Sequence, residues 1–110
     1  MSDVPVARPW VVCLCGSLRF GREFAAERKR LTLDLTIVLA PEATDVSVSD
    51  PSLVRALGEL HLCRIDLAGD EVRIVNPDGY VGEATPREIA YAHSLGKQVT
   101  YLHEPATDDN

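Results

Sequence analysis

The chain has 110 residues, 17 of them acidic and 11 basic, and its formal net charge at pH 7 is -6. A chain of this length is expected to form one domain, residues 1–110, and to bury about two-thirds of its unfolded surface. The negative charge argues against a nucleic-acid polymer as the main partner. Because no apolar run has the length of a membrane span and no signal-peptide pattern opens the chain, we expect no membrane partner and a cytoplasmic protein.

An alternation of apolar and amphipathic segments begins near the N-terminus. Residues 10–15, WVVCLC, form a nearly continuous apolar run, which is typical of a strand covered on both faces. A helix is predicted from about residue 20 to residue 31, and residues 35–40 predict a second buried strand that ends before Pro41. Residues 41–50 are polar and lack clear periodicity, so we interpret them as a candidate lid over a site.

The next predicted helix begins at Asp50 and Pro51, which suit an N-cap and a first helical position. Three leucines recur at helical spacing and are expected to face the sheet, namely Leu53, Leu57 and Leu60. The helix is expected to end at residue 67 or 68, next to Gly69.

The second half of the chain completes the alternation. Residues 72–75 predict a third strand, and residues 76–79, Asn-Pro-Asp-Gly, are a strong turn signal that ends it. Gly96 suits the end of the helix that follows, residues 98–102 predict the last strand, and the acidic tail 103–110 is expected to be frayed. Four strands alternating with helices predict a single-domain, three-layer α/β fold, with a mostly parallel sheet and helices on both faces.

Arg73 is a charged residue within the third predicted strand. A central parallel strand does not normally carry a charge on a buried face. We therefore expect the side chain either to extend to an end of the strand or to meet a partner subunit.

The three cysteines are odd in number and poorly spaced for a disulfide framework. Cys13 and Cys15 fall on one face of the first strand and are interpreted as buried thiols. His61 and Cys63 offer half of a metal site, but no clear second pair of ligands accompanies them. Neither a metal ion nor another cofactor is therefore predicted.

The helix after the third strand opens with an acidic residue. Thr85 suits the N-cap position and Pro86 the first helical position, which places Glu88 three residues after the cap. In a capping box the Glu88 side chain would bond back to the backbone N–H of Thr85, and local chemistry alone favours this interpretation. The same spacing also places the carboxylate beside the loop where open parallel sheets bind ligands.

A glycine turn, Gly16-Ser17-Leu18-Arg19, follows the first strand and leads into a helix. Free backbone N–H groups at such a turn can receive an anion, with Ser17 and Arg19 as further ligands. Alternatively, Ser17 only caps the helix and Arg19 is a solvated side chain. The segment is not a P-loop, because it lacks the Gly-Lys-Ser/Thr ending.

The motifs G-Y-x-G-E-x-T, E-I-x-Y-A and L-G-K, within residues 79–97, resemble those of the nucleoside 2-deoxyribosyltransferase-like superfamily. This superfamily includes nucleoside 5′-monophosphate N-glycosidases, whose Gly-Ser-x-Arg segment binds phosphate as Ser17 and Arg19 would here. The resemblance covers about residues 11–102 and implies a flavodoxin-like strand order of 2-1-3-4. It also implies that Glu88 is the nucleophile that attacks the anomeric carbon, with Ala90 in the place of the family's Gly.

The resemblance assigns further residues to the site. An Asp of the family's preceding helix falls on His61, which suits proton transfer near neutral pH, and Asp66 lies one turn further on as a substitute. Glu83 stands near a phosphate-binding Ser of the nucleotide hydrolases, and its carboxylate would repel a 5′-phosphate but suit sugar hydroxyls. Tyr80 is a candidate for stacking on the base or orienting the carboxylate. The remaining candidates for sugar and base contacts are Asp78, Gly82 and Thr85.

We therefore predict an N-glycosidase or deoxyribosyltransferase that acts on a small-molecule nucleoside or nucleoside 5′-monophosphate. One alternative is a nucleotide-binding or regulatory module without turnover, in which Glu88 is only a cap. Another is an interaction protein that presents its arginine-rich first helix to an acidic partner. A homodimer or larger homo-oligomer is expected, because the chain is short and the family relatives complete each site across a subunit interface.

Overall fold

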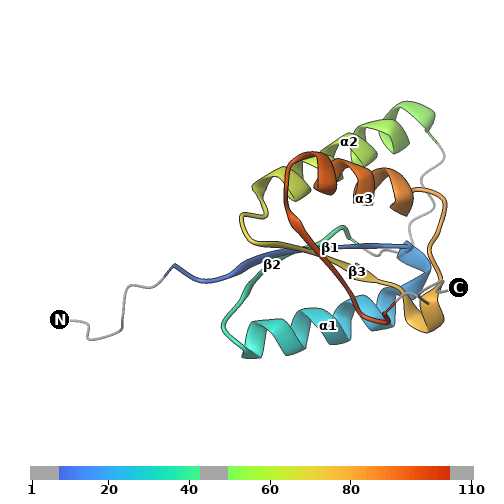
Figure 1. Ribbon diagram of the computed structural model, residues 1–110. Helices are drawn as coiled ribbons and strands as arrows, with labels where there is room; N and C mark the ends of the chain where they lie inside the picture. The colour runs from blue at the N-terminus through green and yellow to red at the C-terminus, as the bar shows by residue number, and fades with distance from the viewer. Residues whose placement is uncertain (1–7, 43–49, 105–110) are drawn as a thin grey trace, which may run out of the picture.

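The computed structural model describes residues 8–42 and 50–104. Its sheet has four parallel strands in the spatial order β2-β1-β3-β4. One face of the sheet is covered by α1 and the other by α2 and α3 (Figure 1). The three-layer α/β class predicted from the sequence is therefore confirmed, and the strand order is the flavodoxin-like one.

The observed elements lie close to the predicted ranges. The strands are β1 (Val11–Gly16), β2 (Ile37–Leu39), β3 (Glu71–Val75) and β4 (Gln98–Tyr101). The helices are α1 (Gly21–Leu33), α2 (Pro51–Leu67) and α3 (Thr85–Ser94), with short 3-10 helices η1 (Leu18–Phe20) and η2 (Pro77–Gly79). Within the described ranges, no helix has the length and apolar character that crossing a bilayer requires.

Strand β1 forms the centre of the core, because it pairs with β2 on one side and β3 on the other. Its side chains alternate between two apolar clusters. Cys13 and Cys15 face the cluster under α2 and α3, whereas Val12 and Leu14 pack with Phe24 of α1. The nearly continuous apolar sequence of β1 thus follows from burial on both faces.

The prediction of a buried strand at residues 35–40 is wrong in extent and burial. The strand shortens to β2, Ile37 is 47% exposed, and Leu35 is 84% exposed with a positive φ of 60°. The reason is topological. Strand β2 lies at the edge of the sheet and pairs only with β1.

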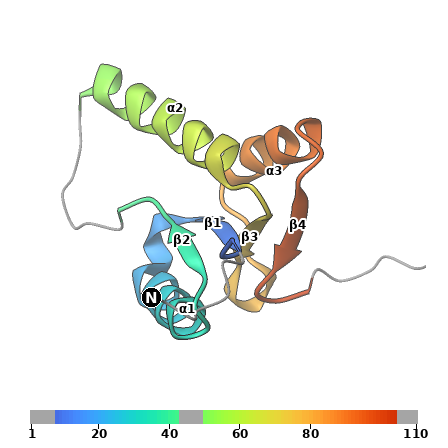
Figure 2. The same ribbon diagram turned by 90° about the vertical axis from the view of Figure 1, so that its left-hand side faces the viewer.

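Helix α2 begins at the predicted cap, where the Asp50 carboxylate accepts a hydrogen bond from the backbone N–H of Ser52 at 2.9 Å. The prediction that Leu53, Leu57 and Leu60 face the sheet is wrong, because all three are more than 40% exposed. The N-terminal half of α2 extends away from the sheet (Figure 2), and the buried positions lie nearer its C-terminal end, at His61, Ile65 and Ala68. The exposed leucines offer the expected homodimer a surface, and that assembly stays a prediction. Most of the candidate lid, residues 43–49, lies outside the described ranges.

Arg73 takes neither of the two predicted positions. Its guanidinium pairs with the buried carboxylate of Glu27 on α1 at 2.5 Å and donates a second hydrogen bond to Thr100 on β4. Glu27 also accepts two hydrogen bonds from Arg30, which hold the pKa of its carboxyl below the ordinary value. The charge in the sheet is thus paired within the chain, between β3 and α1.

The start of the tail is anchored, which corrects the prediction of fraying from residue 103 onward. The side-chain amide of buried Asn76 accepts a hydrogen bond from the backbone N–H of His103 at 2.9 Å and donates one to its carbonyl at 2.8 Å. Asn76 therefore holds the chain just beyond β4, next to the end of β3.

We predict that Glu27→Ala lowers the free energy of unfolding by about 3 kcal/mol, because Arg73 loses the carboxylate that pairs with it in a mostly buried position. Chemical denaturation measures the change. Glu59→Ala is the matched control, since Glu59 forms an exposed pair with Arg87 at 2.6 Å. That variant should lose about 1 kcal/mol or less. Equal losses in the two variants would contradict a structural role for the Glu27 pair.

Candidate functional site

A cleft of about 520 Å³ opens at the carboxyl ends of the strands. It is lined by the loop after β1, the loop after β3 and one side of α2, and Pro41 and Glu42 contribute from beyond β2. The chain leaves β1 toward α1 and leaves β3 toward α3 on the opposite face, so the cleft lies at the switch point where open α/β sheets bind ligands (Figure 1). Its volume falls within the range of about 300–1,000 Å³ that is usual for small-molecule sites.

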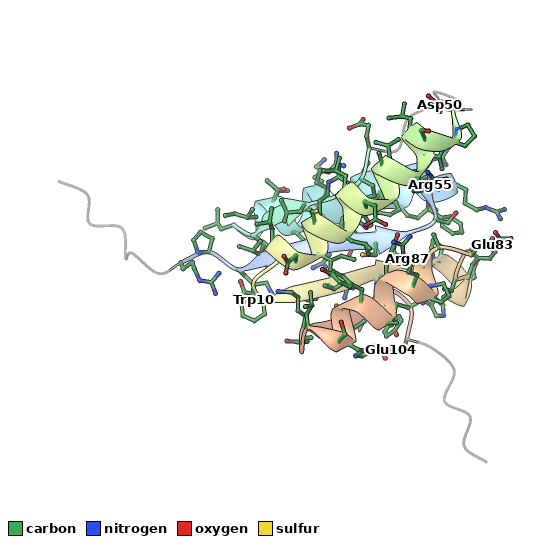
Figure 3. The ribbon with its side chains drawn as sticks, turned by 90° about the horizontal axis from the view of Figure 1, so that it is seen from above. Trp10, Asp50, Arg55, Glu83, Arg87 and Glu104 are labelled. Atoms are coloured by element: carbon green, nitrogen blue, oxygen red, sulfur yellow. The ribbon has the colours of Figure 1, made fainter. Side chains whose placement is uncertain are left out.

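The cleft brings together most of the residues that the sequence predicted for a site. The predicted residues that line it are Gly16, Ser17, His61, Gly82, Glu83, Thr85 and Glu88. Four others do not line it, namely Arg19, Asp66, Asp78 and Tyr80. Figure 3 shows Glu83 at the end of the molecule opposite Trp10, which precedes β1.

The two loops of the cleft approach each other through glycines. A Cβ atom on Gly16, whose φ is 148°, would lie 2.5 Å from the carbonyl oxygen of Val75. A Cβ on Gly82 would lie 3.3 Å from the Cβ of Ser17. The hydroxyl of Ser17 accepts a hydrogen bond from the backbone N–H of Arg19 at 3.4 Å, so Ser17 caps η1 while it also lines the cleft.

The predicted anion ligand Arg19 lies outside the cleft. Its guanidinium is 4.8 Å from the centre of the Tyr80 ring, and Tyr80 packs edge to face against Phe20. This cation–π contact gives both predicted residues a structural explanation. Asp78 has a structural role in the turn after β3, where its φ is 55°. Asp66 is exposed on α2.

Arg64 is a cleft residue that the sequence analysis missed. It lies on α2 one turn after His61, and its guanidinium is 3.4 Å from the Nδ1 atom of that histidine. The spacing of three residues on one helix was the available signal, because it places both side chains on one face. Pro41 and Glu42, which also line the cleft, belong to the segment predicted as a lid. The other lining residues that the sequence analysis missed are Leu18, Leu57, Gly58 and Ala84.

Glu88 does not form the predicted capping box. The N-cap of α3 is Ala84, which accepts a hydrogen bond from the backbone N–H of Glu88, and no side chain caps the helix. Thr85 is instead the first helical residue and is buried. The Oε1 atom of Glu88 is buried without a hydrogen-bond partner. Burial raises the pKa of this carboxyl to about 7, so the group exchanges its proton near neutral pH.

His61 places its Nε2 atom 3.7 Å from Oε1 of Glu88 and 3.3 Å from the thiol of Cys15. Burial, followed by the charge of Arg64, lowers its pKa to about 4. At neutral pH the ring is therefore uncharged. Because a guanidinium only donates, Nδ1 accepts from Arg64, and the ring proton lies on Nε2, facing Glu88 and Cys15. His61 is thus a neutral donor in this state, and its predicted part in proton transfer stays a prediction.

The thiols beneath the cleft are placed as the sequence predicted, because Cys13 and Cys15 are both fully buried. A hydrogen bond with Cys13, together with burial, raises the pKa of the Cys15 thiol. Cys63 is exposed on α2, so it does not join His61 in a site. The ligand atoms of Cys13, Cys15 and His61 lie within 4.8 Å of one another, so among residues 8–42 and 50–104 these three form a group that could hold a metal ion.

Comparison with known proteins adds no further assignment. A scan against protein-family models, a search of curated proteins and a search of solved structures each find no match.

We predict that Glu88→Gln stabilises the protein increasingly as the pH rises from about 4.5 to about 7, relative to the wild type. The carboxyl holds its proton more tightly in the folded state, whose pKa is about 7 against an ordinary value of 4.5. Stability from the protonated form is thus complete below about pH 4.5 and is lost by about pH 7. Melting temperatures across this range measure the difference, which should then level off.

Glu83→Gln is the matched control, because it removes one exposed carboxylate from the loop before the same helix. A plot of its melting temperature against pH should run parallel to the same plot for the wild type. If the plot for Glu88→Gln also ran parallel to that of the wild type, the Glu88 carboxyl would not be buried in the folded protein.

Proposed function

We propose that the protein is a cytoplasmic N-glycosidase or deoxyribosyltransferase of the nucleoside 2-deoxyribosyltransferase-like superfamily, with Glu88 as its nucleophile. The observation that carries the proposal is the unpaired, buried Oε1 atom of Glu88 in a cleft at the sheet's switch point. Buried polar atoms are normally hydrogen-bonded, so an unpaired carboxylate oxygen in a cleft favours an interaction with a ligand. The resemblance of the motifs within residues 79–97 supports a nucleoside or its 5′-monophosphate as that ligand.

The proposed reaction proceeds in two displacements at one carbon. The ionised carboxylate of Glu88 attacks C1′ of the sugar, and the electron pair of the breaking C1′–N bond leaves with the base. Water, or a second base, then attacks C1′ and releases the carboxylate. The Nε2 atom of His61 lies 3.7 Å from Oε1 of Glu88, which is beyond hydrogen-bond length, so His61 packs beside the nucleophile and leaves that oxygen free for the sugar.

The walls of the cleft differ in chemistry, which favours one orientation of the substrate. Leu18 and Leu57 offer apolar contacts to a base, whereas the hydroxyls of Ser17 and Thr85 suit the sugar. Among the described residues that line the cleft, Arg64 supplies the cationic group, and it is the best candidate for contact with a 5′-phosphate.

A nucleotide-binding module without turnover is the second candidate function. It is favoured by the pKa of about 7 at Glu88, because a carboxyl that is still partly protonated at neutral pH can donate a hydrogen bond to a base. This module and the enzyme share the cleft. They differ in whether base is released.

The central experiment is incubation with a panel of nucleosides and 5′-monophosphates, with free base as the readout. We predict base release by the wild type, at a rate that rises with pH up to about 7 as Glu88 ionises in the free protein. Glu88→Gln should reduce the rate by about 10³-fold or more, because an amide cannot attack a sugar carbon. Asp66→Asn is the control carboxylate and should keep full activity, since Asp66 is exposed and does not line the cleft. Turnover by Glu88→Gln would exclude the covalent mechanism.

A second experiment identifies the phosphate ligand. A 5′-monophosphate at about one hundred times its dissociation constant should stabilise the wild type by about 2.7 kcal/mol. At that same concentration, Arg64→Ala should lose most of the gain, whereas Arg19→Ala should keep it because Arg19 packs on Tyr80. Thermal shifts with nucleoside and nucleotide measure the effect. If Arg19→Ala lost the stabilisation by the 5′-monophosphate and Arg64→Ala kept it, Arg19 would be the phosphate ligand.

A further inference from the structure

Two buried thiols and an imidazole meet at the floor of the cleft. Cys13 and Cys15 lie on the same face of β1, and neither side chain has any solvent exposure. His61 reaches this face from α2 and also lines the cleft, so it stands between the thiols and the ligand space. We call Cys13, Cys15 and His61 the thiol–imidazole cluster.

The geometry of the cluster is close to that of a metal site. Its three ligand atoms lie within 4.8 Å of one another, and the Cys15 sulfur is 3.3 Å from Nε2 of His61. In a tetrahedral zinc site, bonds of about 2.3 Å to sulfur and 2.0 Å to nitrogen place neighbouring ligand atoms about 3.5–3.8 Å apart. Side-chain movements of about 1 Å would therefore bring the three atoms into the first coordination sphere of one ion.

We propose that the thiol–imidazole cluster binds a thiophilic divalent cation of the Zn²⁺ type. Two thiolates and one neutral imidazole are soft and borderline ligands that select such an ion over Mg²⁺ or Ca²⁺. Two thiolate charges also neutralise the ion, which suits a site without solvent exposure. The carboxylate of Glu88, 3.7 Å from Nε2 of His61, lies close enough to supply a fourth ligand.

Binding of the ion releases protons from the cluster. Cys13 and Cys15 each lose a thiol proton to solvent when their sulfurs bind the ion, so about two protons are released per ion bound. His61 binds through the lone pair of Nε2, and its ring proton therefore moves to Nδ1. Arg64 can then no longer donate to Nδ1 and has to turn away from the ring.

The test uses Co²⁺ as an optical probe of the purified, reduced protein. We expect a stoichiometric complex with the near-ultraviolet absorption of thiolate-to-cobalt charge transfer and the intense visible bands of tetrahedral cobalt. Zn²⁺ should displace the cobalt, because zinc binds such sites more tightly. The readout requires no turnover, so it stays informative whether or not the protein releases base.

Matched cysteine variants locate the ion. Cys13→Ala should weaken Co²⁺ binding by more than about 100-fold, since loss of a ligand exceeds the 10–100-fold effect of an outer-shell partner. Cys63→Ala should bind like the wild type, because Cys63 is exposed on α2. Thermal melting confirms that each variant folds, and Cys13→Ser replaces Cys13→Ala if the smaller side chain destabilises the core. Absence of charge transfer in the wild type, or its loss only in Cys63→Ala, would overturn the proposal.

Discussion

The pairing of β1 with β3 is the constraint on which the cleft depends. These neighbouring strands run parallel, and their register brings Gly16 beside Val75 at the carboxyl end of the sheet. Because a side chain on Gly16 would collide with the Val75 carbonyl, the close approach requires glycine at this position. The loops leave this point toward opposite faces, and the space between them becomes the binding site. Gly16 thus shapes the cleft whether or not its loop receives an anion.

Buried polar groups are paired on one face of the sheet and partly unpaired on the other. Under α1, Glu27 and Arg73 satisfy each other and make further hydrogen bonds, so the charges are compensated. Under α2 and α3, Glu88 keeps an unpaired oxygen and His61 is held in its neutral form. Uncompensated burial reduces stability, and proteins retain it mainly where a ligand or a reaction makes use of it. The contrast therefore indicates a structural role for the Glu27–Arg73 pair and supports the proposal that the second face carries the site.

Periodicity and turn chemistry were sufficient to predict the α/β class and most element boundaries, because β1, the Asp50 cap and the Gly96 helix end follow strong local rules. They did not reveal how much of α2 packs on the sheet. Leu57 lies one helical turn before His61 and lines the same cleft, yet it is 43% exposed, because the N-terminal half of the helix extends away from the sheet. The resemblance placed His61 and Glu88 in one site. It did not include Arg64, because the contact of Arg64 with His61 depends on how α2 is oriented.

The local signal at Glu88 failed for a physical reason that bears on function. Thr-x-x-Glu normally forms a capping box, but α3 begins one residue earlier and buries Thr85 against the cleft. Glu88 then points toward His61. The Nδ1 atom of His61 contacts Arg64 and its Nε2 atom contacts Cys15, so these neighbours fix which nitrogen carries the ring proton. With the proton on Nε2, the ring accepts from Arg64 through Nδ1; with a metal ion on Nε2, the proton lies on Nδ1 and this contact is lost. If the ion takes the Glu88 carboxylate as its fourth ligand, ion binding and the proposed reaction are mutually exclusive, since both require that carboxylate.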